Sequence, residues 1–259
     1  INNLNDNDPA LPNLLTFSAD ENQTAIGSAA ASDADGDALT YSTTSTEINI
    51  DASTGLLSFI IAPDYETKSL YSADIRVTDG GQTPDFGTVT VNVNNLNDNI
   101  PSITSSATFT ADENQTTIGK VTATDADSDT ITFSISGSEI EIDTSTGVLT
   151  FASAPDYETK SSYSATVTAT DGTNSTTQDI TVSVNNINDS TPSITSSATF
   201  TADENQTAIG TVTATDADSD TITFSISGSE INIDSSSGVL TFASAPDYET
   251  KSSYSATVT

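Results

Sequence analysis

The residues of this chain whose types and spacing could do chemistry are carboxylates that recur in short motifs. The motifs are Asp-Glu-Asn from 20, 112 and 203, Asp-Ala-Asp from 33, 125 and 216, and Pro-Asp-Tyr-Glu from 63, 155 and 246. The 259 residues include 37 Asp and Glu against 5 Lys and Arg, a formal net charge of −32, with no Cys and no His. Oxygen ligands without thiolate or imidazole favour Ca²⁺, and Mg²⁺ is less suited because it keeps its waters and demands octahedral geometry.

The composition also excludes several classes of function. Five scattered cations cannot supply the basic surface that nucleic acid or an anionic membrane requires. Disulfides, thiol nucleophiles and a histidine general base are excluded by residue type, and we expect no enzyme. No apolar run is long enough to span a bilayer. The sequence shows neither a signal peptide nor an initiating Met, so we expect an internal piece of a longer protein.

The chain repeats itself with a period near 91 residues. Residues 101–168 and 192–259 differ at five positions, and a more diverged copy fills 9–100. This period is too long for a solenoid unit and suits one small domain per copy. The predicted division is an incoming linker at 1–8 and tandem domains at 9–99, 100–190 and 191–259. The last domain is predicted to be incomplete, because a counterpart of 169–189 is missing from the sequence.

Each copy alternates apolar and polar residues between turns rich in Asp, Asn, Gly and Ser. Seven such segments in one copy predict an all-β fold of tandem seven-stranded Greek-key sandwiches. In the second copy the predicted strands are 102–111, 117–124, 130–135, 139–143, 147–153, 162–170 and 177–186. The predicted core is Phe109, Val121, Ile131, Phe133, Ile142, Leu149, Phe151, Tyr163, Val167, Ile180, Val182 and Val184.

The strand order sorts the acidic motifs to opposite ends of the sandwich. If neighbouring strands alternate in direction, Asp-Glu-Asn, Pro-Asp-Tyr-Glu and the outgoing linker lie at the bottom, and Asp-Ala-Asp lies at the top. In a head-to-tail array the bottom of one domain meets the top of the next. The first junction then gathers Glu21, Asp64, Glu66, Asp98, Asp125, Asp127 and Asp171, with Asp129 close behind. The second gathers Glu113, Asp156, Glu158, Asp189, Asp216 and Asp218.

Such a cluster requires counter-charge. Two carboxylates ~5 Å apart repel by roughly 3 kcal/mol at an effective dielectric of about 20, against a domain stability of only about 5–15 kcal/mol. No Lys or Arg is placed to neutralise the group. Either the carboxylates stay apart in solvent, as a soluble acidic surface, or Ca²⁺ ions hold them together.

In this order, Asp-Glu-Asn, Asp-Ala-Asp, Pro-Asp-Tyr-Glu, Ala-Thr-Asp-Gly and Asn-x-Asn-Asp-Asn resemble the cadherin extracellular repeat. More closely, they resemble the cadherin-like repeats of large bacterial surface adhesins. The resemblance covers essentially the whole chain and implies three Ca²⁺ at each junction between domains. Its implied ligands add, to the carboxylates above, the linker residues Leu96, Asn97 and Asn99 at the first junction and Ile187, Asn188 and Ser190 at the second. Implied half-sites at the two ends of the chain comprise Asn5, Asp6, Asn7, Asp33, Asp35, Asp79, Glu204, Asp247 and Glu249.

The sequence departs from the family pattern in its linkers. Asn95 and Asn186 stand where the family linker often begins with Asp, which removes a ligand or weakens the middle ion. Ser190 replaces the second linker Asn, which is tolerable if only its carbonyl binds.

The resemblance implies a calcium-rigidified extender or stalk of a surface or secreted adhesin, with neighbouring repeats as its partners. The alternative is a homophilic or carbohydrate-binding module. Tyr65, Tyr157 and Tyr248 are the candidate sugar platforms, although each lies in Pro-Asp-Tyr-Glu and is expected to pack at a junction.

Overall fold

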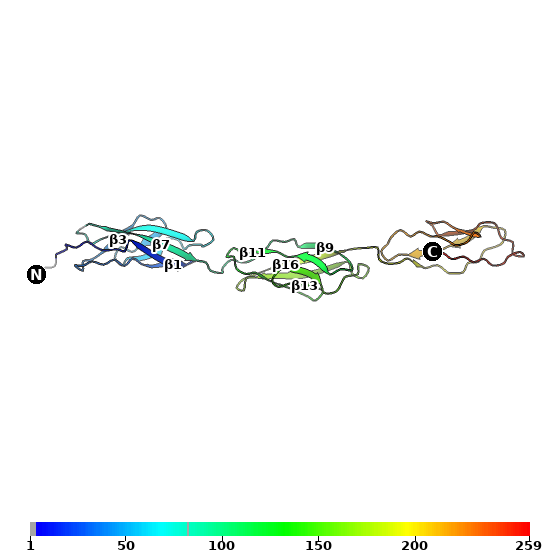
Figure 1. The fold of residues 1–259 in the computed structure, drawn as a ribbon, viewed down its shortest axis with the longest axis horizontal. Coiled ribbons are helices and arrows are strands. Elements are labelled where there is room, and N and C mark those ends of the chain that lie inside the picture. Colours follow the sequence, from blue (N-terminus) through cyan, green and yellow to red (C-terminus); the bar gives the residue numbers. More distant parts are fainter. Residues whose placement is uncertain (1–3, 82) are drawn as a thin grey trace.

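The computed structural model describes residues 4–81 and 83–259, so residues 1–3 of the predicted incoming linker lie outside the described part. The described residues form three all-β modules that follow one another in a row (Figure 1). Within these residues, no helix is long and apolar enough to cross a membrane.

The first module has two sheets that face each other across one core. The four-stranded sheet has the order β1 (Leu14–Asp20), β7 (Asp85–Asn94), β6 (Leu70–Thr78) and β3 (Thr40–Thr43). The three-stranded sheet has the order β2 (Ala25–Ser28), β5 (Leu56–Phe59) and β4 (Ile48–Ile50). Because β1 is parallel to β7, both strands end at the same lower edge. The Asp-Glu-Asn motif and the linker that follows β7 therefore leave the module side by side.

The second module repeats this topology. Its four-stranded sheet has the order β12 (Thr132–Ile135), β15 (Ser162–Thr170), β16 (Ser175–Asn185) and β9 (Thr108–Asp112), with β16 parallel to β9. Its smaller sheets are β10 (Thr117–Lys120), β14 (Val148–Phe151) and β13 (Ile140–Ile142), and the pair β11 (Ala123–Thr124) and β8 (Ser102–Ile103).

Two of the predicted strands are wrong in one respect. The segments 102–111 and 117–124 were each expected to be a single strand, but each is split in two. The first crosses between sheets, since β8 pairs with β11 and β9 pairs with β16. A run of alternating residues does not reveal such a crossing, because both halves keep the same apolar period.

The third module has fewer ladders. It contains β17 (Ser193–Ile194) with β19 (Ala214–Thr215), and a sheet of β18 (Ala208–Thr211), β21 (Val239–Phe242) and β20 (Ile231–Ile233). Residues 199–203 and 253–257, the counterparts of β9 and β15, are described but form no ladder. One isolated bridge joins Ile226 to Val258. In the second module, β16 supplies the strand that pairs with both β9 and β15.

The core of the second module comes from alternate residues of facing strands. Of its predicted core, Val121, Phe133, Leu149, Phe151, Val167, Ile180, Val182 and Val184 are buried. The other four, Phe109, Ile131, Ile142 and Tyr163, are half-buried and pack against that core. Each fully buried Val, Leu or Ile contributes about 1.5–3 kcal/mol, so the rigid sandwich can hold charged loops in place at its two ends.

Candidate metal centre at the module junctions

Four charged side chains are buried within the described part of the chain, and all four are carboxylates at junctions. Glu21 and Glu113 are each 2% exposed, Asp127 is 5% exposed and Asp218 is 7% exposed. Glu21 lies at the lower end of the first module and Asp127 at the upper end of the second; Glu113 and Asp218 repeat the arrangement one module further on. Carboxylates are almost never buried unless they are paired, so each needs an account of its partners.

Glu21 ties its own module to the outgoing linker. It follows β1, and its carboxylate accepts hydrogen bonds from the backbone N–H of Tyr65 at 2.8 Å and of Leu96 at 2.8 Å. Glu113 makes the same pair of bonds, with Tyr157 at 2.8 Å and Ile187 at 2.7 Å. The lower carboxylate is thus held in place by two peptide groups before any ion is considered.

Asp127 ties the same linker to the next module. One of its oxygens accepts hydrogen bonds from the backbone N–H groups of Asp98 at 3.0 Å and Asn99 at 2.8 Å. Burial raises the pKa of Asp127, but the bonds from Asn99 and Asp98 outweigh it and lower the pKa below its usual value. Asp127 therefore stays ionised although it is buried.

Asp218 repeats this anchor at the second junction. It accepts hydrogen bonds from the backbone N–H groups of Asp189 at 3.0 Å and Ser190 at 2.8 Å. Asp35 holds the incoming linker in the same way, through Asp6 at 2.9 Å and Asn7 at 2.8 Å. In three successive linkers, therefore, backbone N–H groups donate hydrogen bonds to the second Asp of the Asp-Ala-Asp motif in the following module.

These anchors bring carboxylates of two modules and their linker together. At the first junction Glu21, Glu66, Asp98 and Asp127 each offer an oxygen, and these oxygens lie within 4.8 Å of one another. Partial burial, together with the charges of Glu21 and Asp127, raises the pKa of Glu66 above its usual value. The corresponding second group is Glu113, Glu158, Asp189 and Asp218.

A second group lies at the top of the second module and contains Asp125, Asp127 and Asp129. Burial raises the pKa of Asp129, and the charges of Asp125, Asp127 and Asp171 raise it further. Asp125 Oδ2 and Asp171 Oδ2 are buried and have no hydrogen-bond partner among the described residues; Asp218 Oδ1 is in the same state at the second junction. A buried carboxylate oxygen without a donor is costly, and a hard cation is the partner that an all-oxygen site fits.

The basic side chains do not neutralise these groups. The ion pairs of the described residues join Lys68 to Glu47, Lys160 to Glu139 at 2.5 Å and Lys251 to Glu230 at 2.6 Å. All three pairs are exposed on the flanks of the modules, where such contacts contribute only about 0–1 kcal/mol.

Other predicted site residues lie at the expected ends of the modules, but their hydrogen bonds differ from those of Glu21 and Asp127. Asp64 accepts from the Thr67 hydroxyl at 2.9 Å, and Asp156 repeats this with Thr159. Asn97 donates its side-chain amide to the Asp171 carbonyl at 3.4 Å.

The implied half-sites lie at the two ends of the chain. Asp33, Asp35 and Asp37 form the upper group of the first module, and Glu204, Asp247 and Glu249 form an exposed lower group on the third.

Sequence analysis missed the asparagines that orient the linker. Asn22 and Asn114 have φ of 63° and 62°, and each donates its side-chain amide to a linker carboxylate, Asp98 and Asp189 respectively. Asn95 donates to the Asp127 carbonyl at 2.8 Å. The Asn that follows each Asp-Glu was the available signal, because Asn tolerates the left-handed backbone that a tight turn needs.

Comparison with known proteins agrees with this geometry. The family profile described as Cadherin domain matches residues 106–185, within the second module. Mouse cadherin-23 EC22-24 superposes with a TM-score of 0.75 at 25% identity, over 94% of this chain and 90% of that one. The chain has the cadherin fold. Human CDH23 EC21-23 gives a TM-score of 0.74 at 22% identity, over 93% and 91% of the two chains. The protocadherin gammaB4 extracellular domain gives 0.70 at 24% identity, over 97% of this chain and 46% of that one.

The fold and the site together define cadherin-like repeats with acidic junctions. At each junction, carboxylates from the lower end of one module, from the linker and from the upper end of the next module lie within 4.8 Å of one another.

Proposed function

We propose that this chain is a calcium-rigidified extender of a surface or secreted adhesin, with Ca²⁺ bound at each junction. The observation that carries the proposal is the meeting of Glu21, Glu66, Asp98 and Asp127 within 4.8 Å, from two modules and the linker between them. Neither module has the complete set of ligands by itself. Ion binding therefore favours the assembled junction over separated modules.

The proposed ligands have different roles in holding the ions. Glu21 and Asp127 are fixed by peptide N–H groups and present their carboxylates to the junction. Asp125 and Asp171 offer the unpartnered oxygens of the upper group. When bound, Ca²⁺ supplies the positive charge that the cluster lacks. At a free concentration 100-fold above its Kd, one site that exists only in the assembled state stabilises that state by about 2.7 kcal/mol.

An extender accounts for the repetition better than a recognition module does. A length-setting role needs units that are alike, and residues 101–168 and 192–259 differ at only five positions. Of the three candidate sugar platforms, Tyr65 and Tyr157 are 36% and 37% exposed and partly packed, whereas Tyr248, which was also expected to pack at a junction, is 65% exposed. The bacterial adhesin context and the count of three ions per junction belong to the same proposal.

Calorimetric titration with Ca²⁺ tests the proposed sites. Asp98→Ala is expected to remove the tightest sites of the first junction and to leave those of the second. Asp189→Ala is the matched variant, because it occupies the same place in the second linker and is expected to show the reverse. Equal titrations for both variants and the unmodified chain would reject the assignment of these linker carboxylates as ligands.

Small-angle X-ray scattering tests the proposed rigidity separately. In Ca²⁺ the three modules are expected to scatter as an extended rod. In EGTA the radius of gyration should change and the distance distribution should broaden. Identical scattering in both conditions would reject ion-dependent stiffening.

A further inference from the structure

One side-chain amide lies among the carboxylates of the first junction. The side-chain nitrogen of Asn99 donates to Asp127 Oδ1 at 2.8 Å, to Asp98 Oδ1 at 3.0 Å and to Glu66 Oε2 at 3.3 Å. These three carboxylates belong to the second module, the linker and the first module, and all three are members of the group whose oxygens lie within 4.8 Å of one another. The positive end of the amide dipole therefore faces the same carboxylates that a cation would use.

The second junction has Ser190 in the place of Asn99. The backbone N–H of Ser190 donates to Asp218 Oδ2 at 2.8 Å, as that of Asn99 does to Asp127. The other oxygen, Asp218 Oδ1, corresponds to the oxygen of Asp127 that the Asn99 amide holds. It is buried and has no hydrogen-bond partner among the described residues, in a side chain that is only 7% exposed. An ion at the second junction can thus bind this oxygen without displacing a donor.

The incoming linker repeats the arrangement of the first junction. Its Asn7 donates a side-chain amide to Asp35 Oδ1 at 2.8 Å and to Asp6 Oδ1 at 3.1 Å. The backbone bonds to the second Asp of Asp-Ala-Asp are the same in all three linkers, with distances of 2.8 to 3.0 Å. The amide contact therefore depends on whether the linker carries Asn or Ser, since the backbone that presents the side chain does not change.

We infer that this linker side chain sets the calcium affinity of its junction, an inference that rests on the proposed function. The Asn99 amide competes with Ca²⁺ for the carboxylates of the first junction, whereas Ser190 does not compete at the second. Ca²⁺ takes six to eight oxygen ligands at about 2.3–2.6 Å, so an ion among Glu66, Asp98 and Asp127 displaces the amide from at least one of them. A hydrogen bond to a charged group corresponds to a factor on the order of ten in an equilibrium constant.

The same amide stabilises the first junction when no ion is bound. It joins Glu66 of the first module to Asp127 of the second through one side chain of the linker. Because these bonds form only in the ion-free state, their loss weakens that state and strengthens ion binding by the same factor. Asn at this position therefore favours a junction that is ordered without calcium, and Ser favours one that depends on calcium.

Amide hydrogen exchange of the whole chain, followed as Ca²⁺ is titrated from EGTA, tests both effects at each junction separately. The amides of Asp98 and residue 99 report on the first junction, and those of Asp189 and residue 190 report on the second. In Asn99→Ser, protection in EGTA should fall about tenfold, and the Ca²⁺ midpoint at the first junction should also fall about tenfold. Ser190→Asn should raise both quantities at the second junction by similar factors.

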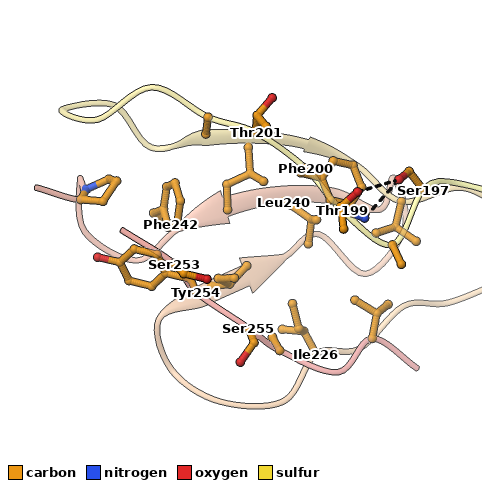
Figure 2. A pocket seen from close by; sticks show the side chains of 18 of the residues that line it. Ser197, Thr199, Phe200, Thr201, Ile226, Leu240, Phe242, Ser253, Tyr254 and Ser255 are labelled. Carbon is orange, nitrogen blue, oxygen red and sulfur yellow. Dashed lines mark hydrogen bonds between the residues drawn. The ribbon is translucent and has the colours of Figure 1, made fainter. Parts of the chain in front are cut away.

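Each variant is compared with the unmodified chain at the same junction, because the third module differs from the second in its core. This core is open between residues 199–202 and 252–258, and Figure 2 shows Phe200, Leu240 and Tyr254 around the opening. Unchanged exchange in β18, β20 and β21 shows that the third module of Ser190→Asn is folded.

Asn94→Ser is the matched control at the first junction. Asn94 donates its side-chain amide to Asp20 Oδ1 at 2.9 Å, and Asp20 is outside the carboxylate group. This variant should leave the Ca²⁺ midpoint unchanged. A midpoint that rises or stays constant in Asn99→Ser, while the unmodified chain responds to Ca²⁺, would overturn the inference and leave the proposed calcium sites in place. Linker amides of the unmodified chain that do not respond to Ca²⁺ would overturn both.

Discussion

Replacing Glu113 by Gln should destabilise the second module even when no calcium is present. Glu113 is 2% exposed and accepts two charge-assisted hydrogen bonds, from Tyr157 N–H at 2.8 Å and Ile187 N–H at 2.7 Å. Gln keeps one acceptor oxygen but turns an amide group toward the other N–H. One such bond is worth about 1.5–3 kcal/mol, and weakening the second from charged to neutral costs roughly 0.5–1 kcal/mol more. The expected loss is about 2–4 kcal/mol, a large share of the stability of a domain this size.

Module-resolved hydrogen exchange in EGTA measures this loss. The slowest amides of β15 and β16 should exchange roughly 30- to 700-fold faster in Glu113→Gln, since each 1.4 kcal/mol is a factor of about ten. Glu204→Gln is the matched control, because Glu204 is exposed and has one peptide donor, at 3.0 Å. It should accelerate exchange in its own module by less than about tenfold. Equal small effects of the two substitutions would refute the view that the lower Glu is a structural anchor as well as a candidate ligand.

Two further substitutions have effects whose sign the structure determines. Asn95→Asp removes the amide that donates to the Asp127 carbonyl at 2.8 Å and adds a negative charge. It should lower junction stability in EGTA by about 1 kcal/mol, as measured by hydrogen exchange, yet tighten Ca²⁺ binding, as measured by calorimetry. Weaker Ca²⁺ binding would contradict this prediction. Asp143 has its pKa lowered to about 2 by hydrogen bonds from Thr146 and Ser145. Its ionised form therefore stabilises the fold above about pH 4, and this contribution is lost as the pH falls toward 2. Asp143→Asn should be less stable at pH 7 and should lack that acid-dependent part of the unfolding midpoint, whereas a midpoint that falls as in the unmodified chain would contradict the assignment.

The regular parts of the fold could be predicted from the sequence because the signals are local. Alternation placed Val167, Val182 and Leu149 in the core, and all three are buried. The split of 102–111 into β8 and β9 could not be predicted, because it depends on which sheet each half joins. Tertiary packing determines which sheet each half joins, and the alternation of apolar and polar residues is the same in either case.

The candidate site was predictable in position but not in its supporting contacts. The strand directions alone bring Glu21 and Asp127 to one junction. The hydrogen bonds that hold these carboxylates, donated by the backbone N–H groups of Leu96 and Asn99, depend on a linker conformation that the spacing of the motifs does not define. Asn22 escaped notice for the same reason, since its role appears only once the left-handed turn aims its amide at Asp98.

Anomalous diffraction from crystals grown in millimolar Ca²⁺ tests the central claim most directly. The account predicts calcium peaks at both junctions, coordinated by oxygens of Glu21, Glu66, Asp98 and Asp127 at the first and of their counterparts at the second. Carboxylates turned into bulk water at both junctions, with no anomalous peak between the modules, would contradict it.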